Sequence, residues 1–209
     1  MTTMMTRRGL IGMSLGTGGL LLSGCASMPG FSLDEAVRRL LSLSSQAAFA
    51  RLVGPGGFFD SEISRLALPG IFAAGSLNGR ILDTLGLRDR LARTLNGVAE
   101  RGAERAAPVV ADAIRSMTIA DAAGIAQGGP TAATDFLRGR MTMSLVDLMV
   151  PEIGQALRML DNNVVRDVVN AVSGYDISRL AGDVSASADG AIWRSIGAEE
   201  SRIRANPQS

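Results

Sequence analysis

The sequence predicts an all-α fold, a compact helical bundle preceded by a signal peptide and a short tether. Three observations support this fold class. Apolar residues recur at three- and four-residue spacing over long segments, which is the period of one helix face. Ser, Thr or Pro precede several of these segments, and Gly-rich turns follow several of them. The sequence also lacks the alternating runs of β-branched residues that form strands.

The composition limits the chemistry that the chain can perform. It has 209 residues, of which 46% are apolar, so it can bury a core that a disordered chain could not. Its 21 basic residues, all Arg, balance 20 acidic residues, which gives no electrostatic case for nucleic acid. His and Lys are absent and Cys occurs once, so we expect no metal, no cofactor, no internal disulfide and no catalytic residues.

The N-terminus has the two parts that open a secretory signal peptide. Arg7 and Arg8 form a positive n-region, and Gly9–Leu22 is an apolar h-region. The h-region is shorter than the about 20 residues that a membrane-spanning helix needs. The arginine pair also resembles a twin-arginine export motif, so the general and the twin-arginine export routes both stay open.

The h-region ends in a sequence that resembles the bacterial lipoprotein box, Leu22-Ser23-Gly24-Cys25. In that box the Cys thiol takes a diacylglyceryl group before the signal peptidase cuts. The alternative is a free or buried thiol behind an ordinary signal peptide, but a lone thiol is a liability in an oxidising compartment. We therefore predict a lipoprotein signal peptide at residues 1–24 and a lipidated tether at residues 25–31.

The predicted lipid determines where we expect the protein. Two or three acyl chains on Cys25 would hold it stably on a membrane, since each buried methylene contributes about 0.8 kcal/mol. Ala26 follows the Cys, and the lack of Asp there resembles lipoproteins sorted to the outer membrane. We expect a lipid-anchored protein of the cell envelope, on the periplasmic face of the outer membrane.

Residues 32–209 are predicted to form a single all-α domain. Ser32 and Glu35 have the spacing of a capping box, and the helix that they open should run to about Val53. Its predicted buried stripe has three- and four-residue spacing: Ala36, Leu40, Leu43, Ala47 and Ala50. Over residues 58–86, Gly and Pro interrupt the pattern, so we expect short helices joined by turns.

A helix of about thirty residues is predicted from Leu87 onward. Pro108 lies inside it and lacks a backbone N–H, so we expect a kink there. The predicted buried face advances in steps of four and three residues: Leu91, Leu95, Val98, Gly102, Ala106, Val109, Ala113 and Met117.

Further helix starts follow along the chain. Thr118 and Asp121 are interpreted as a second capping box, and Pro130 as the first turn of the next helix. Ser144 repeats the cap signature, and a helix is predicted from Pro151 to about Val172. A last helix should follow Asp176 and end at Asn206-Pro207. Its apolar face is Ile177, Leu180, Val184, Ala188, Ile192, Ile196 and Ile203.

One group of polar residues is a candidate interaction or anion site. Its members surround a predicted helix start: Thr131, Thr134, Asp135, Arg138 and Arg140. The free N–H groups of a helix start attract anions, and Thr131 could add a hydroxyl. The plainer interpretation is a surface ion pair between Asp135 and Arg138, worth under about 1 kcal/mol. Glu199 and Glu200, near Arg202 and Arg204, are interpreted as a solvated helix face.

Short motifs in the middle of the chain occur in a characteristic order. They are Met117-Thr118-Ile119, Asp121-Ala122, Gly129-Pro130, Ala132-Ala133-Thr134, Phe136 and Arg138. Other fragments keep the same order over the rest of the chain: Leu68-Pro69, Asn96, Ala99-Glu100, Ala106, Pro108, Pro151, Gly190, Glu199-Glu200, Ile203-Arg204 and Asn206-Pro207. Together they resemble a bacterial exported or lipoprotein family, domain of unknown function family four-one-nine-seven. The resemblance implies an exported helical domain and brings no activity with it.

Three classes of function remain open. The sequence favours a lipid-anchored, non-enzymatic interaction or scaffold domain facing the periplasm, with the membrane and an envelope protein as its partners. The alternative is a carrier of a small apolar ligand or lipid in a pocket between helices, and the third is an enzyme that uses carboxylates. A cavity of several hundred Å³ would favour the carrier, and an exposed apolar patch would favour the interaction domain.

Overall fold

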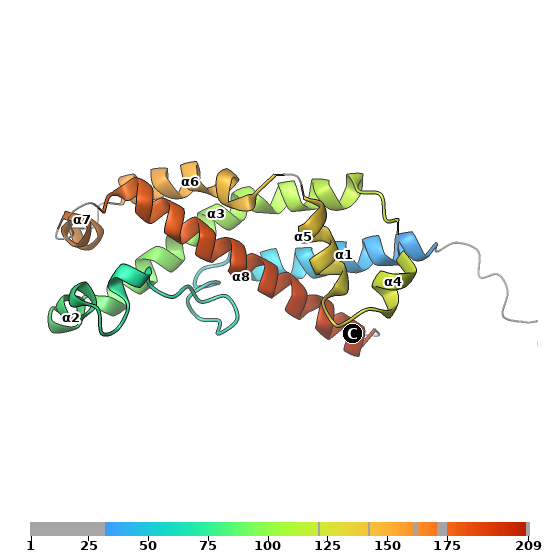
Figure 1. Ribbon diagram of the computed structural model, residues 1–209, viewed down its shortest axis with the longest axis horizontal. Helices are drawn as coiled ribbons and strands as arrows, with labels where there is room; N and C mark the ends of the chain where they lie inside the picture. The colour runs from blue at the N-terminus through green and yellow to red at the C-terminus, as the bar shows by residue number, and fades with distance from the viewer. Residues whose placement is uncertain (1–31, 121, 142, 161–162, 171–174, 208–209) are drawn as a thin grey trace, which may run out of the picture. The chain divides into compact units, whose positions relative to one another are not determined.

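The computed structural model describes residues 32–120, 122–141, 143–160, 163–170 and 175–207 (Figure 1). The predicted signal peptide, residues 1–24, and the predicted tether with Cys25 lie outside these described residues. The described residues form helices and turns without a strand, which confirms the all-α fold class. The helices are α1 (Leu33–Leu52), the 3-10 helix η1 (Gly70–Phe72), α2 (Leu77–Thr84), α3 (Arg88–Ser116), α4 (Ala122–Gln127), α5 (Ala132–Arg140), α6 (Leu145–Met159), α7 (Asn163–Asn170) and α8 (Ile177–Ala205).

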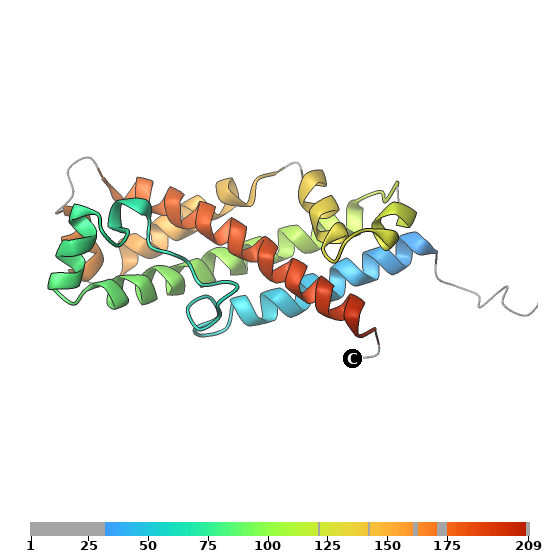
Figure 2. The ribbon, with the colours of Figure 1, turned by 60° about the horizontal axis from the view of Figure 1, so that its bottom comes forward.

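Four helices form the centre of the bundle. α8 packs mainly against α6 and α1, and α3 packs against the same two helices. α3 and α8 have 29 residues each, which corresponds to about 43 Å at 1.5 Å per residue. α4 and α5 pack on α1 and α8, whereas α2 and α7 lie at the opposite end of α3 (Figures 1 and 2). No helix among the described residues is both long and apolar enough to cross a membrane.

The contact between α3 and α6 includes a buried glycine. Gly102 is buried where the two helices meet, and a Cβ atom there would lie 2.9 Å from Cδ1 of Ile153. Such a distance is shorter than side-chain packing allows, so a larger residue at position 102 would force the end of the Ile153 side chain to move. The close contact brings Ile153 and Met149, both fully buried, into the centre of the core.

The start of α1 is confirmed, but its predicted buried stripe is wrong. The Ser32 hydroxyl oxygen accepts the N–H of Glu35 at 3.2 Å, and the helix runs to Leu52. Leu43, predicted to be buried, is 45% exposed. The residues that face the core lie one position further along the helix than most of the predicted ones. The buried positions are Val37, Leu41, Ser44, Ser45, Ala48, Phe49 and Leu52. Because apolar residues occur in adjacent pairs on this helix, spacing alone admits two faces, and packing selects one.

The long helix is confirmed as α3, and Pro108 lies inside it. Its first five predicted core positions are buried: Leu91, Leu95, Val98, Gly102 and Ala106. Beyond Pro108 the prediction is wrong by one position, because Val110 and Ile114 are buried, whereas Val109 and Ala113 are only half-buried. At Ala113-Ile114 the larger side chain takes the core position, because it buries more apolar surface.

Two predicted helix starts near the motifs are wrong. α4 begins at Ala122, so the exposed Thr118, four residues earlier, is not its N-cap. Asp121, the other member of the predicted capping box, lies outside the described residues. α5 has Thr131 at its N-cap, so Pro130 precedes the helix instead of forming its first turn.

The helix predicted from Pro151 to Val172 is also wrong, because the structure has two helices there, α6 and α7. The cap signature at Ser144 is confirmed, since its hydroxyl oxygen accepts the N–H of Val146 at 3.2 Å, and α6 therefore begins before Pro151. Pro151 lies inside α6. It falls in the second turn, beyond the first-turn positions where the missing N–H costs nothing, so it removes one backbone hydrogen bond of the helix.

α8 confirms the last predicted helix. The Asp176 carboxylate accepts the N–H of Arg179 at 2.8 Å, and Asn206 ends the helix. Five of its predicted core residues are at most 2% exposed: Leu180, Val184, Ala188, Ile192 and Ile196. Ile177 and Ile203, at its two ends, are half-buried.

Candidate functional site

A carboxylate of the chain itself occupies the start of α5. Glu200 is 0% exposed. Its Oε1 accepts the N–H of Ala133 at 3.0 Å, and its Oε2 accepts the N–H and the hydroxyl of Thr134, both at 2.7 Å. The first N–H groups of a helix lack intrahelical partners and favour a negative charge. An external anion at these N–H groups would have to displace Glu200.

Arg204 extends this arrangement to the end of α4. Its Nε donates to Oε1 of Glu200 at 2.8 Å. Its two terminal nitrogens donate to the carbonyl oxygens of Ala126 at 3.1 Å and Ile125 at 3.0 Å. The last carbonyl groups of a helix attract a cation in the same way. Glu200 and Arg204, which we call the α8 clamp, therefore hold the end of α4 and the start of α5 on α8.

The other residues of the predicted anion site do not meet at the α8 clamp. The hydroxyl of Thr131 donates to Asp135 at 3.0 Å. Arg138 pairs with Asp189 of α8 at 2.9 Å, rather than with Asp135. The Arg140 guanidinium lies 5.2 Å from the ring centroid of an aromatic residue on its own helix. Of the five predicted residues, only Thr134 contacts Glu200 through its side chain.

The prediction of a solvated face at Glu199 and Glu200 is wrong, since these residues are 3% and 0% exposed. Glu199 forms ion pairs with Arg51 of α1 and with Arg202, the latter at 3.0 Å. α1 and α5 cover this part of α8, and carboxylates are buried in proteins only when they are paired. Among the described residues, no group of three Asp, Glu, His or Cys side chains could hold a metal ion.

A different surface carries exposed apolar side chains. Leu77 and Ile81 of α2 and its C-cap residue Leu85 are 69%, 43% and 61% exposed. At four-residue spacing they lie on one side of the helix, which we call the α2 face. Single exposed aliphatic residues are ordinary on a protein surface, whereas these three lie together on one side of a helix and make the α2 face a candidate binding surface.

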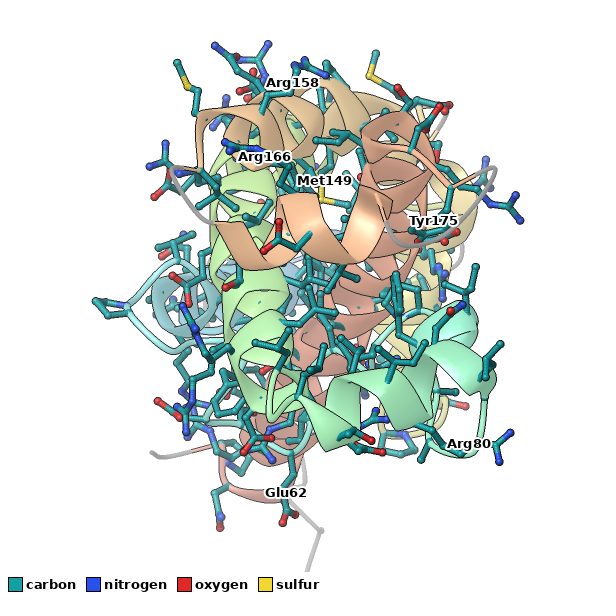
Figure 3. All side chains as sticks on the ribbon, turned by 90° about the vertical axis from the view of Figure 1, so that its left-hand side faces the viewer. Glu62, Arg80, Met149, Arg158, Arg166 and Tyr175 are labelled. Atoms are coloured by element: carbon teal, nitrogen blue, oxygen red, sulfur yellow. The ribbon has the colours of Figure 1, made fainter. Side chains whose placement is uncertain are left out.

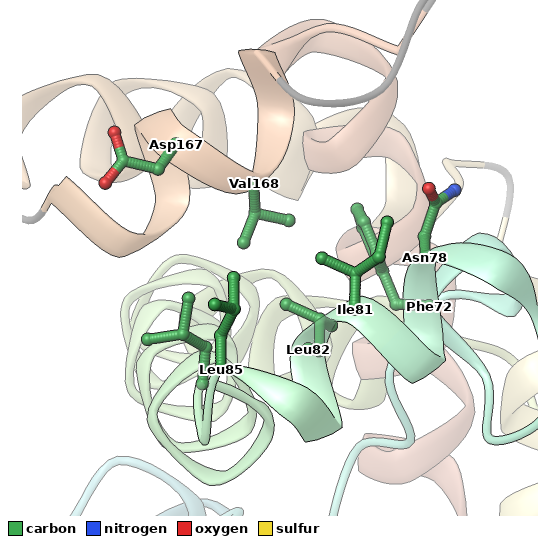
Figure 4. Close-up of a pocket in the computed structure, with 8 residues that line it drawn as sticks. Phe72, Asn78, Ile81, Leu82, Leu85, Asp167 and Val168 are labelled. Atoms are coloured by element: carbon green, nitrogen blue, oxygen red, sulfur yellow. The ribbon is translucent and has the colours of Figure 1, made fainter.

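A narrow apolar crevice lies beside the α2 face, between α2 and α7 (Figure 4). Its volume is about 60 Å³, and its lining includes Phe72, Leu82, Asp167 and Val168. Small-molecule pockets measure about 300–1,000 Å³, so the crevice is far too small for a typical ligand. It has room for the end of one aliphatic side chain.

The α2 face and the crevice lie at the end of the bundle that faces the viewer in Figure 3. α1, the first described helix, begins at the opposite end (Figures 1 and 2). Arg80 is exposed and points outward from α2 (Figure 3). Asp167 is exposed on α7, at the side of the crevice. Arg80 and Asp167 thus place a cation and an anion beside the apolar side chains of this end.

The sequence analysis did not identify the α2 face as a functional surface. The spacing of Leu77, Ile81 and Leu85 is readable in the sequence, and it is the signal that could have found them. The same spacing predicts a buried face equally well, because it does not reveal whether another helix covers those side chains.

Comparison with known proteins identifies one family. No curated protein and no solved structure matches the chain. The family described as "Protein of unknown function (DUF4197)" matches residues 28–209, which include every described helix, the α8 clamp and the α2 face. Since the match covers most of the sequence, the chain belongs to this family of proteins of unknown function.

Proposed function

We propose that this protein is a lipid-anchored, non-enzymatic interaction domain of the cell envelope, which binds a partner through the α2 face. The observation that carries this proposal is the exposure of Leu77, Ile81 and Leu85 on one side of α2. Fully burying an aliphatic side chain is worth about 1.5–3 kcal/mol, so covering this face gives a partner a clear gain in free energy.

The position of the α2 face supports an anchored role. The predicted lipoprotein box at Cys25 precedes α1, and α1 begins at the end of the bundle opposite α2 (Figure 1). α3 runs between these two ends, and its 29 residues span about 43 Å. A lipid on Cys25 would be joined through the chain to the start of α1, and the α2 face, about 40 Å from that start, would be free to bind a periplasmic partner.

The lipid anchor is tested by replacing Cys25. In cells supplied with a palmitate analogue, Cys25→Ser should carry no label and accumulate as an unprocessed precursor, because no thiol remains to be acylated. Ser23→Ala is the matched control, since it keeps a small residue in the box and should be labelled normally. Undiminished label on Cys25→Ser would contradict the anchor.

The interaction role is tested by photo-crosslinking in the intact envelope. A photoreactive residue at Ile81 should give adducts of discrete mass. The same residue at Leu43 of α1 should not, although these two side chains are almost equally exposed, at 43% and 45%. Leu85→Asp should suppress the Ile81 adducts, because a carboxylate would have to be desolvated in the interface. Equal adducts from both positions, or none from Ile81, would exclude the α2 face as the docking site.

An open groove between α1 and α3 favours a second candidate function, the carrier of an apolar ligand. Its volume is about 530 Å³, and its lining is mostly apolar: Phe49, Ala50, Val53, Ala107, Pro108 and Ala111, with Ser45, Gln46 and Glu104. If the protein is a carrier, lipid extracted from the purified protein should fall several-fold in Ala107→Trp, which fills the groove. An unchanged lipid content would exclude this groove.

A further inference from the structure

We infer that the partner of the α2 face is a short amphipathic helix of another protein, with an acidic flank on one side of its apolar stripe and a basic flank on the other. This inference rests on the proposed function and adds to it the chemistry of the partner. It is carried by the shape, the extent and the charge of the surface at the α2–α7 end.

The shape fits the apolar stripe of a helix. Leu77, Ile81 and Leu85 form a ridge along α2, and Leu77 and Leu85 are eight positions apart, or about 12 Å. The crevice lies directly alongside and shares Ile81 and Leu85 with the ridge (Figure 4). A helix that binds in this manner presents side chains at three- and four-residue spacing to such a ridge and groove. One aliphatic side chain of the partner would enter the crevice, and its neighbours would straddle the ridge.

The extent of the surface favours a short segment over a second folded domain. Stable interfaces between folded proteins bury about 800 Å² on each partner. The apolar surface at this end consists of three exposed side chains and one crevice of about 60 Å³, on a helix of 8 residues. Two or three turns of a partner helix would cover it.

The charges beside the ridge differ in sign. Arg80 lies on α2 next to Leu77 and Thr84, away from α7, and these residues line one shallow hollow. Asp167 belongs to α7 and lines the crevice on the other side of the ridge. Both residues are exposed, and neither is in an ion pair with another described residue. A partner helix therefore meets a cation along one edge and an anion along the other.

Neighbouring charges do not alter this pattern. Asp83 and Arg88 form an ion pair with each other. Arg166 is exposed on α7 but does not line the crevice. An anionic lipid surface would require a cluster of basic residues, whereas Arg80 and Asp167, on the two sides of the ridge, carry opposite charges. The balance of charge thus favours a protein helix over a membrane surface.

Three synthetic helical peptides with the same apolar stripe test the inference. The first carries Glu on one flank and Lys on the other, the second Glu on both flanks, and the third Lys on both. Fluorescence anisotropy measures their affinity for the full-length protein in lipid nanodiscs, so that no detergent covers the α2 face. The first peptide should bind at least about five-fold tighter than the other two at low salt, and the preference should fade as salt is added.

Charge reversal of the rim makes the test specific. Arg80→Glu leaves two anions beside the ridge and should transfer the preference to the peptide with two Lys flanks. Asp167→Arg leaves two cations and should transfer it to the peptide with two Glu flanks. These changes lie on exposed side chains, so thermal unfolding should be unaltered. Equal affinity for all three peptides, or an unchanged preference in both variants, would overturn the inference.

Two further variants separate this inference from the proposed function. Leu85→Asp should abolish binding of the first peptide, and Leu43→Asp on α1 should leave it unchanged. If no peptide binds while the Ile81 adducts persist in the envelope, the partner is not such a helix and only the inference fails. If the adducts join two copies of this chain, the partner is a second copy and the inference of a helix from another protein is wrong. If the adducts are absent, the proposed function fails.

Discussion

Thr134 donates both its backbone N–H and its hydroxyl to one oxygen, Oε2, of the buried Glu200, at 2.7 Å each. These two residues, together with Arg204, belong to the motifs by which the sequence resembles its family. Their hydrogen bonds hold α4 and α5 on α8, so this part of the resemblance has a structural role. The α2 face lies outside those motifs and at the other end of the bundle.

Removing the Glu200 carboxylate should destabilise the protein strongly. Glu200→Ala leaves Arg204 and the N–H groups of Ala133 and Thr134 without their acceptor, and breaking a buried ion pair costs about 3–5 kcal/mol. Urea denaturation of the purified protein measures this loss. The control is Glu152→Ala, whose exposed pair with Arg105 spans 3.9 Å and should contribute less than about 0.5 kcal/mol. Similar losses for both variants would contradict the clamp.

The hydroxyl of Thr134 should matter more than that of Thr118. Thr134→Val keeps the shape of the side chain but loses a hydrogen bond to a buried carboxylate, which costs about 1.5–3 kcal/mol. Thr134→Ser retains the hydroxyl and should recover most of this loss. Thr118 is exposed and is not a helix N-cap, so Thr118→Ala should change the unfolding free energy by less than about 0.5 kcal/mol. Thermal unfolding of the three variants ranks them; a larger loss for Thr118→Ala would restore its predicted capping role.

Asn96 should hold the segment before η1 against α3. Its Oδ1 accepts the N–H of Leu66 at 2.8 Å, and its Nδ2 donates to the carbonyl oxygen of Ala92 at 2.8 Å. Asn96→Ala leaves the buried Leu66 N–H unpaired, which costs about 1–3 kcal/mol. We expect faster hydrogen exchange at the Leu66 amide and faster proteolysis of residues 54–69. Gln155→Ala removes an exposed amide on α6 and should change neither rate. Unchanged exchange at the Leu66 amide in Asn96→Ala would show that Asn96 does not hold this segment.

Tyr175 should make the protein sensitive to alkali. Burial, and then its hydrogen bond to Asp183 at 2.8 Å, raise the pKa of Tyr175 well above its ordinary value of 10.0. Because the folded pKa is the higher one, the stabilisation is complete below pH 10.0 and is lost as the pH rises above that value. The chain has one Tyr, so tyrosinate absorbance reports this side chain alone. As the pH is raised, the tyrosinate absorbance should increase only when the protein unfolds, and not before.

Tyr175→Phe provides the control for the alkaline transition. At neutral pH its unfolding free energy should be about 1 kcal/mol lower, because the hydrogen bond to Asp183 is lost. That free energy should then stay level between about pH 9 and about pH 11, because no phenol is left to ionise. Tyrosinate that is half formed at pH 10.0 in the folded wild-type protein would contradict the raised pKa of Tyr175.

Local rules in the sequence determined much of the fold. The spacing of apolar residues predicts α3 and the buried face of α8, and the caps at Ser32 and Asp176 predict where α1 and α8 begin. These features depend on residues within one or two turns of each other, because helix period and capping are properties of the local backbone. The candidate site was predictable only in part: Thr134 lies at the start of α5, but its partner Glu200 is 66 residues away.

Only the tertiary structure decided which helix faces are covered. Leu180 and Val184 have the same four-residue spacing as Leu77 and Ile81, yet the first two are buried and the other two are exposed. Likewise, the charged end of α8 is predicted to be solvated, yet its Glu200 is buried. The difference is whether a distant segment packs there: α6 and α1 cover much of α8, and α5 brings its N–H groups to Glu200. In the part of the chain that the structure describes, no element covers the α2 face. The spacing of its residues could not reveal this, because burial is a property of the contact between segments and not of either segment alone.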